Sequence, residues 1–397
     1  MNRTFREELA ASLAALKGAG KFKTLRYLEG PMGVEVNMEG AGKVLCLCSN
    51  DYLGLANHPD VVRAGKAGLE RYGAGTASVR FICGTLCAHR ELEREIAAFH
   101  RTEAAVTYVS CWAANTGVVP TFVGPEDIVI SDELNHASLI DACRLATKTA
   151  RAIYRHGDMK DLEEKLAAAK KYRRKLVLTD GVFSMEGDIA RLPDMLELAK
   201  RYDAVLLVDD SHGVGVLGKH GRGTAEHFGV EGELDIVTGT LGKALGGAAG
   251  GYVAASAPAV ETLVQSSRPQ IFSNALPATV ASSALAAIRI LASEPERVGK
   301  LHRNVEYFRE GLKRRGFKPL ESPSAIIPII VGDTAFAIKM SEELLREGVY
   351  VIGFGYPVVP EGTARIRVQI SAAMERDHMD RALEAFERVG RRLGVLR

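Results

Sequence analysis

Short apolar runs rich in β-branched residues alternate with helix-type segments through the long middle part of this chain. Each run is continuous and bounded by polar or glycine residues, which is typical of strands buried on both faces of a parallel sheet. The runs include 105–109, 128–130, 176–178 and 205–208, and the helical patterns include 158–170 and 192–202. This alternation predicts an α/β fold with a mostly parallel central sheet and helices on both of its faces.

The pattern changes after about residue 280. A helix-rich stretch is followed by a strand at 326–331, a helix at 334–347 and two further strands at 349–352 and 364–370. This order is typical of a smaller α+β domain, and 397 residues are enough for one large core plus such a domain. We therefore predict an N-terminal helix and extended segment (1–45), a large domain (46–280) and a C-terminal small domain (281–397).

Composition narrows the class of protein. The net charge is +2 with 25% charged residues, which gives no electrostatic reason to expect nucleic acid or a membrane as partner. The cysteine spacings Cys46/Cys48 and Cys83/Cys87 resemble metal half-sites, but a structural zinc site normally needs four ligands, so no metal is expected. Acidic residues in the N-terminal helix argue against a mitochondrial presequence, and we expect a cytoplasmic protein.

Polar clusters follow several of the predicted strands. The strand at 205–208 runs directly into Asp209, Asp210 and His212. Ligands of open parallel sheets bind at the carboxyl ends of the strands, and acids buried there are costly unless they have partners. The cluster therefore indicates a ligand site, with a turn of solvated aspartates as the plainer alternative.

A second cluster places Lys243 among small residues at 238–247. The pattern is not a P-loop, because Val237 stands where the first glycine belongs and Ala244 follows the lysine. A lysine in dry surroundings has a lowered pKa and can act as a nucleophilic amine. Most lysines are simply solvated, so this cluster alone is a weak indication.

Two more clusters follow strands. Ser184 lies in the stretch 179–188, where its hydroxyl can bind a phosphate or cap a turn. Ser110, Cys111 and Trp112 follow the strand at 105–109 and begin a predicted helix. Backbone N–H groups at the start of a helix form an anion site.

In this order and spacing, the four clusters resemble the α-oxoamine synthase family of fold-type-I enzymes that use pyridoxal 5'-phosphate (PLP). The resemblance covers nearly the whole chain and includes the stretches 57–59, 77–85, 135–138 and 371–373. It implies a PLP-dependent acyltransferase that condenses glycine with an acyl-CoA.

The resemblance also implies roles for single residues around the cofactor. Lys243 would hold PLP as a Schiff base, and Asp209 would pair with the pyridine nitrogen and keep it protonated. His212 would reach the phenolic oxygen, and His136 would stack on the ring. The phosphate would lie near Cys111, Trp112, Thr240 and Ser184.

Other residues are assigned to the substrates and to a second subunit. Ser273 and Asn274 match positions that reach the site of the neighbouring subunit, so the resemblance implies a homodimer with its site at the interface. Asn50 and Arg367 would bind the carboxylate of glycine, with Arg367 as a two-pronged donor. Arg26 matches a residue near the CoA or acyl group.

The acyl group is the least determined part of the prediction. Val79 and Phe81 are apolar and offer no partner for a distal carboxylate, which disfavours succinyl-CoA. The match is closest to the acetyl-transferring branch, which forms 2-amino-3-oxobutanoate in threonine breakdown, with threonine dehydrogenase as a transient partner. A longer acyl chain, as in the biotin-pathway branch, or broad tolerance stays open.

Two other classes of protein are disfavoured. Non-catalytic partner subunits of this family lack the Schiff-base lysine, whereas Lys243, Asp209, His136 and His212 are all present. Aminotransferases or desulfurases of the same fold do not share the joint pattern at 77–85 and 364–373.

Overall fold

The computed structural model describes residues 2–396 and forms two compact units. One unit is Asn50–His302, and the other combines Met1–Ser49 with Arg303–Arg397. The N-terminal segment belongs with the C-terminal one, because strand β2 (Gly42–Cys46) pairs in parallel with β11 (Val349–Tyr350). These bounds differ from the three parts expected from the sequence, and that three-part division stays a prediction.

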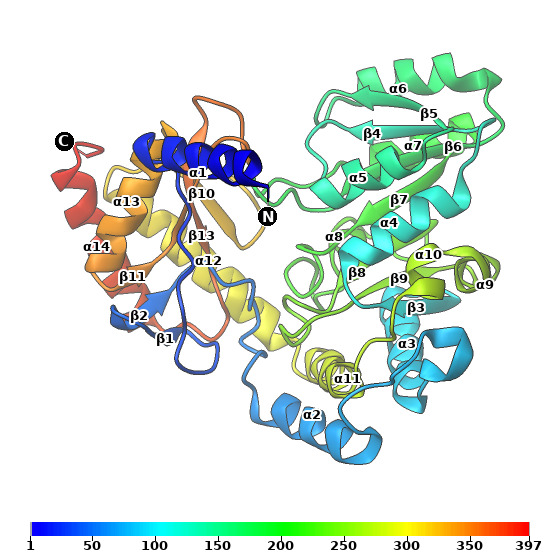
Figure 1. Ribbon diagram of the computed structural model, residues 1–397, viewed down its shortest axis with the longest axis horizontal. Helices are drawn as coiled ribbons and strands as arrows, with labels where there is room; N and C mark the ends of the chain where they lie inside the picture. Colours follow the sequence, from blue (N-terminus) through cyan, green and yellow to red (C-terminus); the bar gives the residue numbers. More distant parts are fainter. Residues whose placement is uncertain (1, 397) are drawn as a thin grey trace. The chain divides into compact units, whose positions relative to one another are not determined.

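The unit Asn50–His302 is built on a seven-stranded sheet in the order β3-β9-β8-β7-β6-β4-β5 (Figure 1). Only β9 runs antiparallel to its neighbours in this sheet, so the prediction of a mostly parallel sheet is confirmed. The strands are β3 (Ala104–Tyr108), β4 (Ile128–Asp132), β5 (Ala150–Tyr154), β6 (Lys175–Asp180), β7 (Val205–Asp209), β8 (Ile236–Thr240) and β9 (Gly251–Ala255).

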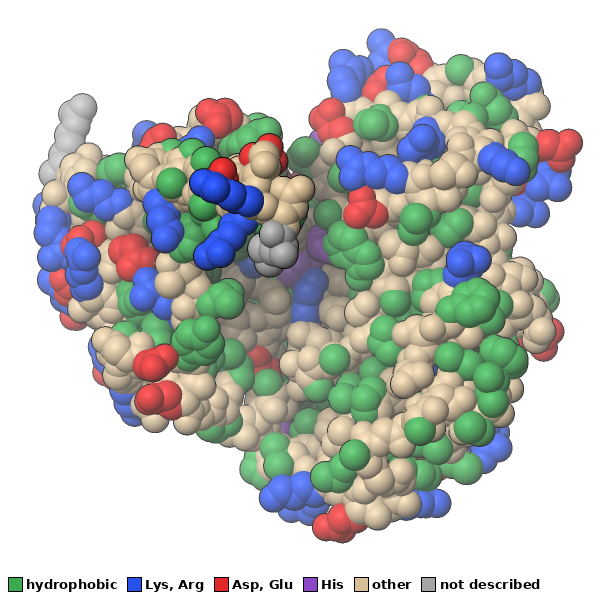
Figure 2. All heavy atoms as spheres, in the orientation of Figure 1, with side chains coloured by type: hydrophobic (Ala, Val, Ile, Leu, Met, Phe, Trp, Pro, Cys, Tyr) green, Lys and Arg blue, Asp and Glu red, His purple; other side chains and the backbone are tan. Residues whose placement is uncertain are grey.

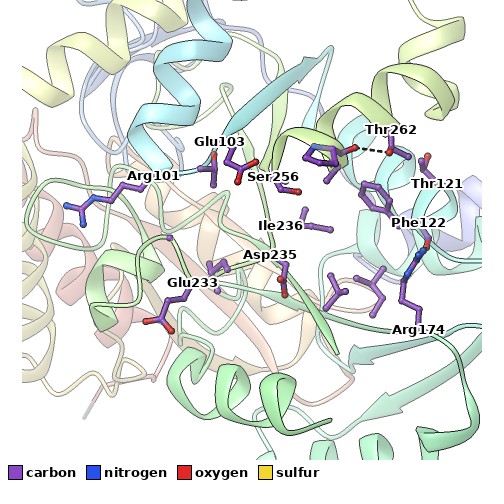
Figure 3. Close-up of a pocket in the computed structure, with 18 residues that line it drawn as sticks. Arg101, Glu103, Thr121, Phe122, Arg174, Glu233, Asp235, Ile236, Ser256 and Thr262 are labelled. Carbon is purple, nitrogen blue, oxygen red and sulfur yellow. Dashed lines mark hydrogen bonds between the residues drawn. The ribbon is translucent and has the colours of Figure 1, made fainter. Parts of the chain in front are cut away.

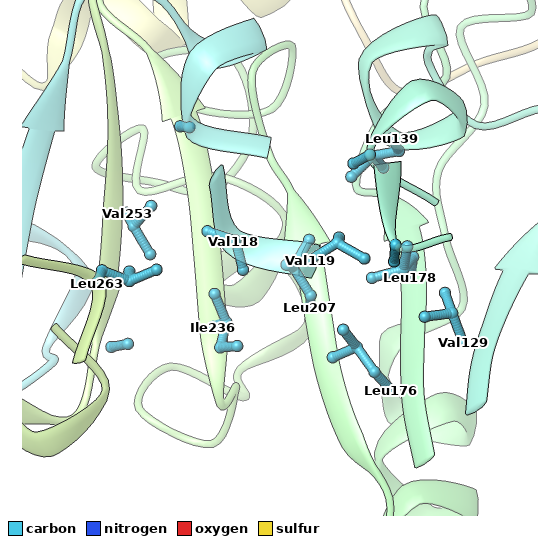
Figure 4. Packing of buried hydrophobic residues seen from close by; sticks show 14 of the residues in the cluster. Val118, Val119, Val129, Leu139, Leu176, Leu178, Leu207, Ile236, Val253 and Leu263 are labelled. Atoms are coloured by element: carbon cyan, nitrogen blue, oxygen red, sulfur yellow. The ribbon is translucent and has the colours of Figure 1, made fainter. Parts of the chain in front are cut away.

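Helices cover both faces of this sheet. One face is packed by α4, α5 and α9, whose Val118, Leu139 and Leu263 meet Leu207 and other strand residues in one apolar cluster (Figure 4). The alternate strand residues, such as Leu206, are buried as well, and α7 packs against β7. The α-helices of this unit are α2 (Pro59–Tyr72), α3 (Cys87–His100), α4 (Cys111–Phe122), α5 (Ala137–Leu145), α6 (Met159–Ala168), α7 (Leu192–Tyr202), α8 (Thr224–Phe228), α9 (Ala257–Ser266), α10 (Arg268–Phe272) and α11 (Ala278–Ser293). A π-helical turn, η1 (Arg80–Gly84), and a 3₁₀ turn, η2 (Ala169–Lys171), complete it.

The other unit contains two three-stranded sheets, in the orders β1-β2-β11 and β10-β13-β12. Its further strands are β1 (Glu35–Met38), β10 (Ile326–Gly332), β12 (Ile352–Phe354) and β13 (Ala364–Gln369). Its helices are α1 (Arg3–Gly18), α13 (Thr334–Arg346) and α14 (Arg376–Arg392). Helix α12 (Glu296–Arg314) begins in the unit Asn50–His302 and ends in this one. The mixture of helices and strands predicted for this part of the sequence is present.

Side chains of both charge signs are interspersed over the face shown in Figure 2, in keeping with the small net charge. Among the described residues, none of the helices is long and apolar enough to cross a bilayer.

Candidate active site

A cavity of about 220 Å³ lies at the carboxyl ends of the parallel strands. Asp180 ends β6, Asp209 ends β7 and Thr240 ends β8, and all three line it. This is the edge at which open parallel sheets bind their ligands. The full lining is Ser110, Cys111, Trp112, His136, Ser138, Asp180, Val182, Asp209, Ser211, His212, Thr240 and Lys243. The fold thus brings together seven of the predicted site residues, namely Cys111, Trp112, His136, Asp209, His212, Thr240 and Lys243.

The start of α4 forms one wall of the cavity. The Ser110 side chain accepts a hydrogen bond from Ala113 N at 3.1 Å and so caps the helix. Cys111 and Trp112 are the first two residues of α4, and the backbone N–H groups of a first helical turn have no acceptor within the helix. Gly251, at the start of β9, lies so close that a Cβ there would overlap the backbone of Ser110 and Cys111. A helix start held against the sheet in this way is suited to bind an anion.

Two neighbouring aspartates have different environments. The Asp209 carboxylate lines the cavity, accepting a hydrogen bond from Asn115 Nδ2 at 2.6 Å and another from Ser211 N at 3.0 Å. Asp210 does not line the cavity, and its carboxylate accepts hydrogen bonds from Thr224 N and Thr224 Oγ1. Burial raises the pKa of Asp210 to about 6. Asp209 is therefore the carboxylate placed to meet a ligand, and Asp210 serves the packing of the loop.

The Cys111 thiol also lies near Asp209. Its Sγ is 3.7 Å from Asp209 Oδ2 and 3.3 Å from Ser211 Oγ. Burial, and then the charge of Asp209, raise the pKa of Cys111 well above its ordinary value. The thiol is thus neutral and a poor nucleophile, and Lys243 lines the same cavity.

His136 lies at the beginning of α5, as its N-cap. Its backbone N–H donates to Asp180 Oδ2 at 3.0 Å, and its ring lies edge-on to Trp112 with 6.1 Å between centroids. Desolvation of the ring lowers the pKa of His136, although the residue itself is exposed. Burial and the nearby Asp209 raise the pKa of Asp180 well above its ordinary value.

Tyr52 and Asn115 contact this site and were not predicted from the sequence. The Tyr52 hydroxyl lies 2.8 Å from His212 Nδ1, and both side chains are buried. Asn115 is fully buried on α4 beside Asp209. The position of Asn115 four residues after Cys111, one helical turn along the predicted helix, was the signal available for it.

Three predicted cofactor residues do not line the cavity. Ser184 is half-buried in the loop after β6, whose Asp188 is 2.8 Å from His156 Nε2. Ser273 and Asn274 follow α10, and Asn274 is exposed and forms a bridge with Val79. Their roles stay predictions.

The predicted substrate residues lie in different units. Asn50 is half-buried and is the first residue of the unit Asn50–His302. Arg26 and Arg367 belong to the other unit. Arg26 Nη2 is 2.5 Å from Glu342 Oε1, and both residues line a separate cavity of about 240 Å³. Arg367 is buried, donates to Gln369 Oε1 at 3.2 Å and lies over the Phe354 ring. Their roles toward substrates likewise stay predictions.

A larger cavity, of about 680 Å³, lies at the opposite edge of the sheet (Figure 3). It is lined by the first residues of the parallel strands, such as Val205 and Ile236. Its acids have partners, since Glu103 accepts from Ala257 N, Asp235 from Leu206 N, and Glu233 from Lys200 Nζ. Among the described residues, its lining contains no lysine, cysteine or histidine, so this cavity does not have the composition of a catalytic site.

Comparisons with known proteins agree with this geometry. The family model described as "Aminotransferase class I and II" matches residues 42–386. The chain is 46% identical to the 2-amino-3-ketobutyrate coenzyme A ligase of Escherichia coli K12, with both chains covered in full. It is also 46% identical to the 8-amino-7-oxononanoate synthase of Thermosipho melanesiensis, with 98% of each chain covered.

A solved structure of a related enzyme has the same fold as this chain. The serine palmitoyltransferase of S. paucimobilis, with a bound PLP–myriocin aldimine, superposes with a TM-score of 0.93 at 33% identity, covering 100% of both chains. This chain belongs to the aminotransferase class I and II family and, within it, to the α-oxoamine synthases.

Proposed function

We propose that this protein is a PLP-dependent glycine C-acetyltransferase, which condenses glycine with acetyl-CoA to 2-amino-3-oxobutanoate and CoA. The observation that carries the proposal is the presence of Lys243 in one cavity with Asp209, His136 and His212. The 46% identity to a full-length 2-amino-3-ketobutyrate coenzyme A ligase supports the same activity.

The cavity residues fit PLP. Asp209 offers a buried carboxylate for a protonated ring nitrogen, and the start of α4 offers N–H groups for a phosphate. Two buried oxygens beside this region, Asp180 Oδ1 and Thr238 Oγ1, have no hydrogen-bond partner in the described chain. Unpaired buried polar atoms are costly, which favours a polar ligand here. Lys243 would hold the cofactor covalently.

When bound, PLP supplies an electron sink next to the α-carbon of glycine. Lys243 Nζ would accept the α-proton of the bound glycine as a general base. Arg367 would bind the glycine carboxylate as a fork, with Asn50 as a further donor. His212 would donate to the phenolic oxygen, and its orientation is held by Tyr52.

The acetyl group is the choice that the sequence favours, since Val79 and Phe81 are apolar. A second candidate is 8-amino-7-oxononanoate synthase, because a relative with that activity in its name is equally identical to this chain. Pockets discriminate single methylene groups poorly, so broad acyl tolerance belongs to the same alternative.

We also propose a homodimer, with Ser273 and Asn274 serving the neighbouring subunit. In support, η1 packs against α10, and together they present Phe81, Ile82 and Phe272, each more than 60% exposed. An apolar patch of this kind is typical of a protein interface. Sedimentation combined with activity on dilution tests this, and a fully active monomer would contradict it.

The cellular setting remains part of the proposal. We expect a role in threonine degradation, with a transient contact to threonine dehydrogenase, and a cytoplasmic location. The human relative is named as mitochondrial, so fractionation of the native host is the direct measurement of location. Co-purification at low salt tests the dehydrogenase contact.

The decisive experiment is an acyl-CoA panel. The ratio kcat/KM is measured with glycine and acetyl-, propionyl-, succinyl- or pimeloyl-CoA, following CoA release and product mass. We expect acetyl-CoA to lead and the product to keep the glycine carboxylate. A preference of more than about tenfold, roughly 1.4 kcal/mol, for pimeloyl-CoA would favour the second candidate. Lys243→Ala is the matched inactive control, because it removes the nucleophile and the proton acceptor together.

A further inference from the structure

A chain of hydrogen bonds connects Asp209 to His136 through two side chains outside the predicted site. Asn115 Nδ2 is 2.6 Å from Asp209 Oδ2 and 2.9 Å from Ser138 Oγ. Ser138 Oγ is in turn 2.8 Å from His136 Nδ1. Asn115, Ser138 and Asp209 are buried, so water does not compete for the hydrogen bonds among these three, while His136 at the end of the chain is exposed.

The direction of each hydrogen bond in this chain is fixed by chemistry. An ionised Asp209 can only accept, so the Asn115 amide must turn its nitrogen toward it. The second N–H of the same amide is then left for Ser138 Oγ, and Asn115 Oδ1 points elsewhere, without a hydrogen-bond partner in the described chain. A reversed amide would set two acceptors against each other, which the burial makes costly.

The end of the chain fixes the tautomer of His136. The backbone N–H of Ser138 donates to His136 Nδ1 at 3.2 Å, so this nitrogen must carry a lone pair. Because the Ser138 oxygen already accepts from Asn115, its own proton is free to point at the same nitrogen. The remaining ring proton then lies on Nε2.

We propose that Asn115 and Ser138 are positioning residues that lock His136 as the neutral Nε2–H tautomer and tie it to Asp209 through one amide group. His136 then has no free lone pair, so it is a donor and a stacking group toward the cofactor and not a proton acceptor. The same amide fixes the carboxylate that faces the ring nitrogen. This inference rests on the proposal that the cavity holds PLP, while its tautomer part concerns the protein alone.

The first test is spectroscopic and needs neither substrate nor turnover. Nitrogen-15 NMR of the histidine-labelled protein, with and without PLP, should show His136 with a protonated Nε2 and an unprotonated Nδ1; the signal is assigned with His136→Gln. Ser138→Ala should shift the Nδ1 resonance and mix the two tautomers, and Ser138→Thr, which keeps the hydroxyl, should restore the wild-type signal. A proton on Nδ1 of the wild-type protein would overturn the inference.

The second test is a double-mutant cycle on the PLP dissociation constant. Asn115→Leu and Ser138→Ala should each weaken PLP binding about tenfold. The double variant should bind PLP as tightly as the more affected of the two single variants, because both substitutions break the same chain of hydrogen bonds. Effects that multiply to about a hundredfold would show independent roles and contradict the proposal. Ser267→Ala is the matched control, since its hydroxyl is equally buried but meets Tyr108 at the far side of α4; it should change binding less than twofold.

These outcomes are separate from the proposed acetyl transfer. An enzyme that prefers another acyl-CoA would leave both tests unchanged. A protein that fails to bind PLP would remove the cofactor proposal, while the tautomer measurement on the cofactor-free protein would still decide for or against the chain of hydrogen bonds.

Discussion

The Tyr52 hydroxyl lies 2.8 Å from Nδ1 of His212, although the two residues are 160 positions apart in the chain. Tyr52 is 1% exposed, so the contact lies in the buried interior and helps to orient the His212 ring at the cavity. A histidine that is bonded at one ring nitrogen presents the other in a fixed protonation state.

Tyr52→Phe should therefore impair His212 without disturbing the fold. Loss of one buried hydrogen bond costs about 1 to 2 kcal/mol, so we expect kcat to fall roughly five- to thirtyfold with a smaller change in KM. Steady-state kinetics with the preferred acyl-CoA measures this, alongside the thermal midpoint of both proteins. An unchanged kcat would mean that Tyr52 has no part in orienting His212.

Asp209→Asn should abolish most of the activity, whereas Asp210→Asn should leave most of it intact. Asp209 lines the cavity and Asp210 does not, so only the first should lose activity. We expect Asp209→Asn to keep PLP but lose at least about a hundredfold in kcat, or roughly 2.7 kcal/mol, because a neutral amide does not hold the ring nitrogen protonated. Asp210→Asn is the matched control and should keep most of the rate in its folded fraction. A larger loss in Asp210→Asn would show that the two roles are exchanged.

The strand ends were readable from the sequence because a parallel strand buried on both faces is a continuous apolar run. Asp209, Thr240 and Lys243 follow or end such strands and come together in one cavity. Strands β5, β8 and β9 were not singled out; in β5 the exposed Arg151 interrupts the apolar run. The topology then decides which strand ends are neighbours.

The supporting contacts could not be read in the same way. Asn115 meets Asp209 from 94 positions away, and no local pattern encodes such a pair. The N-terminal segment joins the C-terminal unit because β2 pairs with β11, which is again a pairing distant in sequence. The residue roles that rest on the family resemblance, such as those of Arg26, Ser273 and Asn274, stay predictions.

His156 is expected to make stability depend on pH. Its Nδ1 is 3.0 Å from Asp132 Oδ1 and its Nε2 is 2.8 Å from Asp188 Oδ2. Burial acts to lower the pKa of His156, but the hydrogen bonds and charges of the two carboxylates outweigh it and raise the pKa to about 10. A raised histidine pKa stabilises the fold fully below about pH 6.5, and this stabilisation is lost as the pH rises through about 10.

His156→Gln should therefore destabilise the protein more at pH 6 than at pH 10. Asp188 is 42% exposed, and solvent screening reduces such a pair, so we expect a difference of about 2 kcal/mol between the two pH values. Urea unfolding of wild type and variant at both pH values gives the comparison, and groups common to both proteins cancel. Equal destabilisation at pH 6 and pH 10 would show that the imidazolium charge does not matter.

Gly251→Ala should disturb the anion-binding end of α4. A Cβ at this position would overlap the backbone atoms of Ser110 and Cys111, and backbone cannot rotate away as a side chain can. The start of α4 must then move from the sheet edge, at a cost of about 1 to 3 kcal/mol. Because the N–H groups of Cys111 and Trp112 move with it, we expect PLP to bind at least tenfold more weakly.

Gly124→Ala is the matched control for this prediction. Gly124 lies just beyond the other end of α4, and a Cβ there would meet only Asp127 Oδ2, at 3.9 Å. It should leave PLP affinity within about twofold and lower stability by less than about 1 kcal/mol. Titration of the cofactor-free variants with PLP, together with inorganic phosphate as a competitor, separates the two parts of the site. A different outcome is that Gly251→Ala weakens PLP binding but leaves the affinity for competing inorganic phosphate unchanged. In that case the phosphate group would have to bind somewhere other than the start of α4.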